Sequence, residues 1–475
     1  MKTSTLARAL LTCAALGLTG CATVGPNYVT PEVKTPATWQ QLDAKGSTRT
    51  YGGENYDLSR WWLTLDDPIL SELVEKALSA SPDLRGAQAK LRESRARRSV
   101  AAADRYPGVT ASGSAARSRS SEKSGSGATA NLFSAGFDAS WELDIFGGVR
   151  RGVEAASADL EASTASLEDV QVTLAAEVAQ SYLELRTLQK RLGIARENLA
   201  SQSETLQLTE WRSQAGLVSV QDVEQARSNR EQTKAQIPAL ETSLAEAEHR
   251  LELLLGETPG SLRERLAAAR ELPALPAEVA VGIPAETLRQ RPDVRGAERK
   301  LAAETARVGV AQAARYPSLK LSGSIGVEAL TAGGLLGASA AKSSILGGIT
   351  ASVFDAGKLR AQVEIQDAVR EQALVAYQQS VLTALQEVEN ALVSLSQNQE
   401  REMALSTAVT AARSAAEMAR QRYGAGLIDF QSVVDTERNV LSVEDTLAAT
   451  RGDRLQSLVA LYKALGGGWR REGEQ

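Results

Sequence analysis

Histidine and cysteine, the side chains that most often bind metals or act as nucleophiles, are nearly absent from this 475-residue sequence. It contains one histidine, His249, and two cysteines, Cys13 and Cys21. A zinc site or a Ser–His–Asp relay needs several such side chains close together. His249 is flanked by Glu248 and Arg250, which is typical of a solvated helix residue. We therefore expect no enzyme and no metal site.

Cys21 follows a segment that resembles an export signal. Lys2 and Arg8 precede a short apolar stretch, residues 9–18, that is too short to span a membrane as a helix. Leu18-Thr19-Gly20-Cys21 resembles the bacterial lipoprotein box, in which the cysteine becomes the first residue and carries lipid. The alternative is ordinary signal cleavage beside an incidental cysteine. We expect a signal peptide at residues 1–20 and lipid attachment at Cys21.

Composition narrows the class of protein further. The sequence has 53 basic and 58 acidic residues and a net charge of −5, without a long basic run, so nucleic acid is not an expected partner. Aromatic residues make up only 4% of the chain against 43% apolar residues in all. A core of alanine, leucine and valine at helical spacing fits this composition better than a phenylalanine-rich β-sandwich.

An internal repeat with a constant offset of 210 residues organises the chain. Residues 81–114 and 291–324 are identical at 18 of 34 positions without a gap. The same offset pairs Ala215-Gly216-Leu217 with Ala425-Gly426-Leu427, and Leu255-Gly256 with Leu465-Gly466. The expected divisions are a signal peptide at 1–20, an N-terminal extension at 21–69, a first repeat at 70–256, a connector at 257–284, a second repeat at 285–466 and a tail at 467–475.

Each repeat predicts a helix, two strands, a very long helix and a returning helix. The first helices run from Pro82 to about Tyr106 and from Pro292 to about Tyr316, where a proline follows. The long helices are expected from about Gly152 to Trp211 and between Gly357 and Gly424. Apolar residues in the second one alternate at spacings of four and three, which predicts a heptad seam for helix packing: Val381, Leu385, Val388, Leu392 and Leu395.

Two segments in each repeat alternate apolar and polar residues with a period of two. They are residues 109–115 and 133–143 in the first repeat, and 319–328 and 345–353 in the second. Strands of this length match the hydrocarbon thickness of a bilayer, although a half-buried sheet in a soluble protein has the same pattern. A sheet in lipid must close, and four strands are too few for a pore. We therefore expect several copies to share one barrel, with three copies giving twelve strands.

Longer motifs give the sequence a resemblance to a known family. They are Val24-Gly25-Pro26-Asn27-Tyr28, Trp61-Trp62 followed by Asp67-Pro68, Arg291-Pro292-Asp293-Val294, Ala314-Arg315-Tyr316-Pro317 and the stretch from Leu461 to Trp469. In this order they are similar to the TolC-type outer-membrane efflux channels, in the lipoprotein branch of the OprM/NodT kind. The resemblance implies a mainly α-helical trimer with a small β part. A twelve-stranded transmembrane β-barrel would continue into a long periplasmic α-helical barrel.

The resemblance also implies that no cofactor is bound, and it implies partners and two functional regions. The partners are a periplasmic adaptor protein, an inner-membrane pump and outer-membrane lipid. Gly216-Leu217 and Gly426-Leu427 match the hairpin tips where the adaptor docks, with alanine in place of the family's valine before each glycine. The alternative for each tip is a plain turn between helices.

Asp435 and Arg438 match the family's gate, in which carboxylates from the chains narrow the pore. Gln431 stands where family members often have an apolar residue, and the first repeat has Gln225 and Ser228 at the equivalent positions. The alternative is an exposed ion pair on one helix. As a whole, we expect an exit duct for drugs and other small toxic compounds. A duct for one-step protein secretion and a lipid-tethered coiled-coil scaffold without a pore are the other hypotheses.

Overall fold

The computed structural model describes residues 23–42, 49–51, 57–282 and 284–469. The predicted signal peptide, Cys21 and the end of the predicted tail lie outside the described residues. The chain divides into two compact units, and each repeat contributes to both. Unit 1 contains residues 1–32, 90–164 and 296–378, and unit 2 contains residues 33–89, 165–295 and 379–475.

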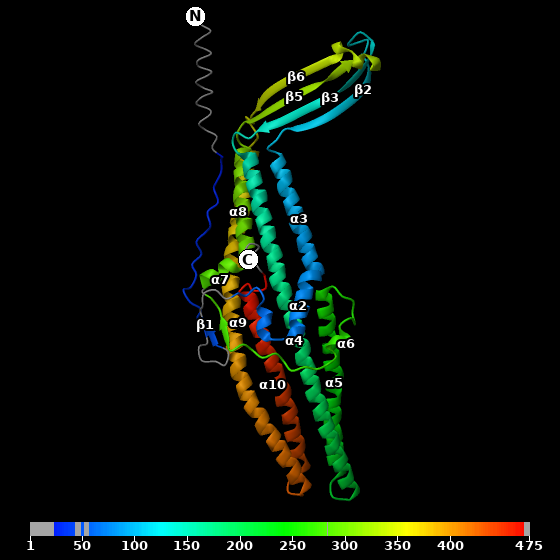
Figure 1. The fold of residues 1–475 in the computed structure, drawn as a ribbon, viewed down its shortest axis with the longest axis vertical. Coiled ribbons are helices and arrows are strands. Elements are labelled where there is room, and N and C mark those ends of the chain that lie inside the picture. The colour runs from blue at the N-terminus through cyan, green and yellow to red at the C-terminus, as the bar shows by residue number, and fades with distance from the viewer. Residues whose placement is uncertain (1–22, 43–48, 52–56, 283, 470–475) are drawn as a thin grey trace. The chain divides into compact units, whose positions relative to one another are not determined.

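Unit 1 contains a four-stranded sheet in which every neighbouring pair is antiparallel (Figure 1). The strands in spatial order are β2 (Gly108–Arg119), β3 (Thr129–Leu143), β5 (Ser318–Ala329) and β6 (Ala341–Thr350). The short helices η2 (Ala332–Leu336) and η3 (Ala338–Ala340) connect the last two strands. All four predicted strands are confirmed, although the fourth ends before the predicted Val353.

The early end of β6 has a local cause. After Thr350 the chain turns towards helix α9, with Ala356 and Gly357 at φ angles of +53° and +87°. The carboxylate of Asp355 accepts hydrogen bonds from the backbone N–H groups of Gly357 and Leu359, both at 2.9 Å. This acidic turn replaces sheet pairing over the residues that the alternating pattern had assigned to the strand.

The register of the sheet sorts its side chains into two chemically different faces. On one face, Phe137 of β3 lies opposite Ala111 and Ile325. On the other, Ser134 lies opposite Ser114, with their hydroxyl groups 2.9 Å apart. The period-two pattern of the sequence is therefore the real alternation of an apolar and a polar face.

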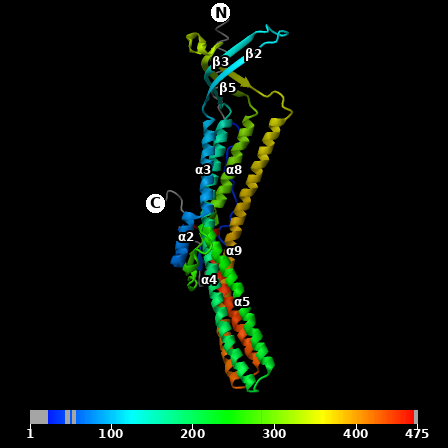
Figure 2. The ribbon, with the colours of Figure 1, turned by 90° about the vertical axis from the view of Figure 1, so that its right-hand side faces the viewer.

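The helices of unit 1 form a row. Their bounds are α3 (Pro82–Ala103), α4 (Gly148–Gln214), α8 (Pro292–Ala313) and α9 (Lys358–Gly424). Within unit 1, α3 contacts α4 through Ser94 and Ser163, whose hydroxyl groups are 2.7 Å apart. Figure 2 shows the row from a second side. The predicted first helices are confirmed, and each ends three residues before the predicted tyrosine because the last turn loosens ahead of the proline.

In unit 2, α4 and α9 each pair with a returning helix. The returning helices are α5 (Val220–Leu255) and α10 (Phe430–Ala464). The remaining elements of unit 2 are β1 (Arg49–Tyr51), η1 (Trp61–Leu65), α2 (Pro68–Ala80), α6 (Arg263–Leu266), β4 (Glu278–Ala280) and α7 (Pro284–Gln290). The predicted order of elements is confirmed in both repeats, and α4 and α9 have 67 residues each.

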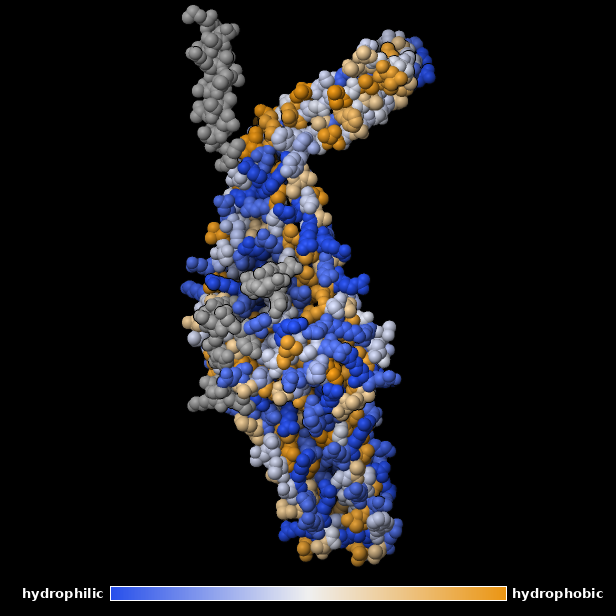
Figure 3. All heavy atoms as spheres, viewed as in Figure 1, coloured by the Kyte–Doolittle hydropathy of each residue, from blue (hydrophilic) through white to orange (hydrophobic). Residues whose placement is uncertain are grey.

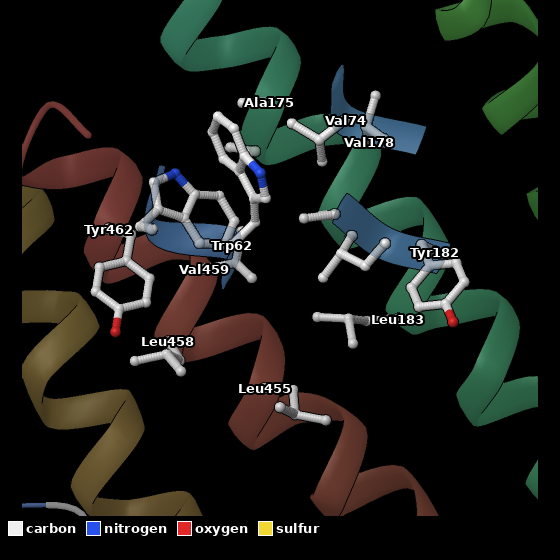
Figure 4. Packing of buried hydrophobic residues seen from close by; sticks show 14 of the residues in the cluster. Trp62, Val74, Ala175, Val178, Tyr182, Leu183, Leu455, Leu458, Val459 and Tyr462 are labelled. Carbon is white, nitrogen blue, oxygen red and sulfur yellow. The ribbon is translucent and has the colours of Figure 1, made fainter. Parts of the chain in front are cut away.

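The main hydrophobic core lies in unit 2, around two tryptophans (Figure 4). Trp61 and Trp62 are 1% and 2% exposed, and the ring of Trp61 stacks on that of Tyr462 with centroids 5.2 Å apart. The heptad seam is confirmed as a buried stripe of α9, because Val381, Val388, Leu392 and Leu395 are at most 2% exposed and Leu385 is partly buried against the core. The twin tryptophans thus join the N-terminal extension to the end of the second repeat.

No helix among the described residues has a stretch that is both long and apolar enough to cross a membrane.

Candidate functional site

The end of each long hairpin in unit 2 is closed by the same tight turn. Gly216 has a φ angle of +72° and Gly426 one of +73°, values that favour glycine. The backbone N–H of Leu217 donates to the carbonyl of Arg212 at 2.9 Å, and that of Leu427 donates to Arg422 at the same distance. These bonds satisfy carbonyl groups that the end of a helix leaves without partners.

Both turns are followed by a residue that caps the returning helix. The hydroxyl of Ser219 accepts from the backbone N–H of Asp222 at 3.2 Å, and the Asp222 carboxylate accepts from the Ser219 backbone in return. In the second hairpin, the Asp429 carboxylate accepts from the hydroxyl of Ser432 at 2.6 Å and from its backbone N–H at 3.0 Å, and these contacts lower the pKa of the Asp429 carboxyl. The turns are therefore rigidly specified on both sides.

The leucine in each turn points away from the protein. Leu217 is 68% exposed and Leu427 is 71% exposed. The space-filling view shows hydrophobic atoms at the ends of both hairpins (Figure 3). An exposed leucine with no packing partner contributes nothing to the stability of a single chain, and such residues often mark contact surfaces.

A small core directly behind the turns holds the two hairpins together. It contains Leu206, Val223, Ala226, Ala419, Tyr423, Phe430, Val433 and Val434. Arg212 of α4 donates through Nη1 to the carbonyl of Tyr423 in α9 at 2.7 Å, and its guanidinium lies 4.5 Å from the centre of the Tyr423 ring. Packing and a cation–π contact therefore fix the spacing between the two tips.

The predicted gate residues lie near this core but do not pair with each other among the described residues. The side-chain amide of Gln431 donates to the Asp435 carboxylate at 2.8 Å, and both side chains are exposed. Arg438 donates through Nε to the side-chain oxygen of Asn229 in α5, also at 2.8 Å. The Asp435 carboxylate is thus exposed beside Gln431 on the same helix, whereas Arg438 links the two hairpins.

A buried carboxylate that lies between the two gate residues on α10 was missed from the sequence. Glu437 is 3% exposed; it accepts from the hydroxyl of Thr205 in α4 at 2.7 Å and lies 3.5 Å from Arg420 of α9. Burial raises the pKa of Glu437, and the contacts with Thr205 and Arg420 oppose that shift. The sequence contained one indication, because Glu437 lies between Val433, Val434 and Val440, which mark the buried face of α10.

Glu444 follows seven residues later on the same face of α10. It is 7% exposed, lies 2.5 Å from Nε of Arg413 and accepts from the side-chain amide of Asn198 at 3.1 Å. The two buried glutamates each contact both α4 and α9. They tie the returning helix to both long helices by polar contacts that a hydrophobic seam alone would not provide.

The glutamate at 437 has an equivalent of opposite charge in the first repeat. The offset of 210 carries Glu437 to Arg227 and Arg420 to Glu210. Arg227 and Glu210 also form an ion pair, at 3.4 Å, between the long and returning helices of the first hairpin. The same contact is therefore built twice, with the cation and the anion exchanged.

Two further family motifs, one in the N-terminal extension and one near the start of the second repeat, make structural contacts in unit 2. The Asp67 carboxylate accepts from the backbone N–H groups at the start of α2 and from the hydroxyl of Tyr182 at 2.7 Å. Burial raises the pKa of Tyr182 to about 12, and the contact with Asp67 adds to that shift. Arg291 donates to the carbonyl of Ala464 at 2.9 Å and pairs with Glu387 at 2.7 Å.

The motif that begins at Val24 docks on unit 1. Arg151, which is 3% exposed, donates through Nη2 to the Gly25 carbonyl at 3.2 Å and to the side chain of Asn27 at 2.8 Å. A Cβ on Gly25 would lie 2.4 Å from the Cα of Gly309, so the segment fits only with glycine there. The described residues that follow Cys21 are thus held by a buried arginine.

The described residues contain no group of three or more histidine, cysteine, aspartate or glutamate side chains placed to hold a metal ion. His249 is exposed on α5.

Comparison with known proteins places these features in a family. The model of the outer membrane efflux protein family matches residues 73–257 and 283–467. Nodulation protein T of Rhizobium leguminosarum bv. trifolii is 33% identical over 465 residues, which cover 95% of each chain. The pyoverdine export outer membrane protein OpmQ of Pseudomonas putida is 34% identical over 462 residues, or 96% of each chain.

A solved structure agrees with the assignment. The outer-membrane channel OprN is 39% identical and superposes with a TM-score of 0.88, covering 94% of this chain and 99% of that one. The match includes the sheet, the long helices and the hairpins rather than a single motif. This chain therefore belongs to the outer membrane efflux protein family and is a TolC-type channel protein of the outer membrane, as its motifs predicted.

Proposed function

We propose that three copies of this chain form a passive exit duct for drugs and other small toxic compounds, coupled to a periplasmic adaptor and an inner-membrane pump. The four-stranded sheet carries this proposal. Phe137, Ile325 and Ile345 are 58%, 65% and 86% exposed on it. Within the described part of the chain, the edge strands β2 and β6 each pair on one side only. An apolar face with open edges is stable in lipid only if the sheet closes.

Closure by copies of the same chain fits the strand directions. Neighbouring strands alternate in direction from β2 to β6, so the two edges run opposite to each other. The β6 edge of one copy can therefore extend the same antiparallel pattern onto β2 of the next. Two copies would give eight strands, a barrel that side chains fill, whereas three copies give twelve strands and leave a lumen.

Planar-bilayer recording combined with light scattering tests this proposal. Detergent-purified protein should have the mass of a trimer, and its addition to a lipid bilayer should give discrete steps of ion conductance. A monomer without conductance would favour the tethered scaffold and refute the duct.

The exposed leucines of the hairpin turns are the proposed contact for the adaptor. Leu217→Asp with Leu427→Asp should abolish adaptor-dependent efflux and leave bilayer conductance unchanged, because neither side chain packs within the chain. Leu253→Asp is the matched control, since Leu253 is 72% exposed on α5 and lies far along the helix from the turn. Equal loss of efflux in the control would remove the turns from the docking surface.

The proposed gate and anchor complete this function. Three exposed Asp435 carboxylates, one from each copy, would form an anionic ring that favours cations and narrows the pore. Arg438 and Gln431 would set its position through the contacts with Asn229 and Asp435. Lipid on Cys21 would fix the N-terminus to the outer membrane, and the mass of the mature N-terminal peptide tests this modification directly.

A further inference from the structure

The apolar face of the four-stranded sheet carries two charged residues, and both lie near one end of β2. Arg117 and Arg119 are opposite Asn131 and Thr129 of β3 in the register. Opposite residues of an antiparallel pair share a face, and every second residue of a strand returns to it. Both arginines therefore lie on the same face as Phe137. Every other residue on this face of the four described strands is uncharged.

Both arginines lie at the end of the sheet that is remote from the helices of unit 1. β2 begins just after the end of α3, and β3 ends just before the start of α4, so the turn between β2 and β3 is at the opposite end (Figure 1). The helices belong to the periplasmic part of the channel. Arg117 and Arg119 therefore lie towards the exterior, on the side of the outer leaflet.

The length of the apolar stretch places the two arginines at the level of the lipid headgroups. On β3 this face carries only apolar side chains from Leu143, next to the helices, to Phe133. At about 3.4 Å per residue the stretch is about 34 Å long, and a strand tilt of about 40° reduces its height to about 26 Å. The apolar band of outer-membrane barrels is about 25 Å tall. Asn131 and Thr129, with the two arginines opposite them, follow directly beyond this band.

Positive charge at this level fits an anionic lipid surface. A charge on the lipid face is costly in the middle of a bilayer and nearly neutral close to its surface, where a long side chain can reach the headgroups. Residues 117–128 contain three basic residues and one acidic residue, in a chain with a net charge of −5. Residues 330–340 connect β5 and β6 at the same end of the sheet and contain no charged residue. The positive charge is thus concentrated beside β2.

Neither arginine has a strong partner within the chain. Arg117 is exposed and forms no ion pair among the described residues. Arg119 pairs with Glu122 at 3.5 Å, and the two side chains are 70% and 79% exposed, so this surface pair contributes little. The offset of 210 carries the two positions to Val327 and Ala329 of β5, which shows that such a strand also accepts apolar residues there. Both guanidinium groups are therefore free to bind a ligand outside the chain.

We propose that Arg117 and Arg119 bind the phosphate groups of lipopolysaccharide in the outer leaflet. This inference rests on the proposed channel, because it needs the apolar face to meet lipid, and it adds a lipid-binding site to that channel. A guanidinium group can donate two parallel hydrogen bonds to one phosphate. Alternate residues of a strand are about 7 Å apart, so the two arginines can bind one phosphorylated headgroup together.

Native mass spectrometry of the detergent-purified full-length protein tests this site with lipid A, the phosphorylated anchor of lipopolysaccharide. Arg117→Gln with Arg119→Gln should bind lipid A at least about ten times more weakly than the parent protein, because hydrogen bonds to charged groups are lost. Arg117→Lys with Arg119→Lys should retain most of the binding, because the charge remains. Arg263→Gln with Arg270→Gln is the matched control: it removes the same charge from two exposed arginines of unit 2 and should bind as the parent does.

Dephosphorylated lipid A separates phosphate recognition from binding of the acyl chains. The parent and the double glutamine variant should both bind it weakly and equally. Excess inorganic phosphate should leave most of the lipid A on the parent; complete displacement would indicate a site for free anions and overturn the assignment to lipid.

Equal binding of lipid A by the parent and the double glutamine variant would also overturn the proposed site. Planar-bilayer conductance of the same samples distinguishes this outcome from failure of the proposed function. A parent that conducts while both proteins bind lipid A equally refutes the lipid site alone. A parent that forms no channel refutes the duct, and with it the reason for placing this face in lipid.

Discussion

The buried pair of Thr205 and Glu437 allows a sharp test of what holds the two hairpins together. Thr205→Val keeps the shape of the side chain but removes the hydroxyl that donates to Glu437 at 2.7 Å. At pH 8 it leaves a carboxylate that is 3% exposed without its buried donor, with only Arg420 at 3.5 Å as a partner. A hydrogen bond to a charged group contributes about 1.5–3 kcal/mol.

That loss should appear as faster local opening of α10. Because about 1.4 kcal/mol corresponds to a factor of ten, amides near Glu437 should exchange with deuterium roughly ten to a hundred times faster in the variant. Hydrogen-exchange mass spectrometry of detergent-solubilised protein measures this directly. Amides of the four-stranded sheet should be unchanged and serve as the internal reference.

Two further variants separate the hydrogen bond from packing. Thr205→Ser retains the hydroxyl and should exchange nearly as the parent protein does. Thr205→Val combined with Glu437→Leu removes both polar partners and should recover much of the lost protection, because no buried carboxylate is left unpaired. If Thr205→Val exchanges at the parent rate, or if Thr205→Ser is equally fast, the polar contact does not stabilise the hairpin pair.

Three other predictions concern the same region. The pKa of Glu437 is raised in the folded chain, so the local stability of α10 should fall as the pH rises from about 4.3, the pKa of an unfolded glutamate, through the folded pKa. Glu437→Gln should flatten this dependence in hydrogen-exchange rates that are corrected for the intrinsic effect of pH on exchange. Replacing Asp435 and Arg438 together by alanine should raise single-channel conductance, and an unchanged conductance would exclude them from the gate. Gly426→Ala should destabilise the turn by about 1–2 kcal/mol because the φ angle of Gly426 is +73°. Gly193→Ala should stabilise helix α4 by about 0.5–1 kcal/mol, because a Cβ at Gly193 meets nothing within 4 Å. Hydrogen exchange should therefore become faster near Gly426 and slower near Gly193.

Local sequence patterns were sufficient to predict most of the fold. The absence of glycine and proline between Gly357 and Gly424 predicted α9 nearly to the residue, because few other signals end a helix. The period of two in residues 133–143 likewise predicted the core of β3. The end of β6 was wrong because Val353 continues the alternation, while the turn at Asp355 depends on backbone contacts that alternation does not encode.

The hairpin turns were predictable for the same reason, and the polar contacts behind them were not. Gly216 and Gly426 identify their turns by residue type alone. Glu437 is an ordinary glutamate in the sequence, and only its position between α4 and α9 makes it a buried group. Asp435 and Arg438 are spaced for an ion pair on one helix, but Asn229 of another helix is the partner of Arg438. Partner choice across helices depends on tertiary structure.

The exchanged charges of the two hairpins also bear on how a duplicated chain avoids folding wrongly. Arg227 with Glu210, and Glu437 with Arg420, let each long helix close with its own returning helix. If α10 took the place of α5 against α4, Glu437 would meet Glu210, and α5 in the place of α10 against α9 would bring the guanidinium groups of Arg227 and Arg420 together. Like charges at such positions repel. The newly made polypeptide can therefore distinguish two otherwise similar halves by the sign of one pair.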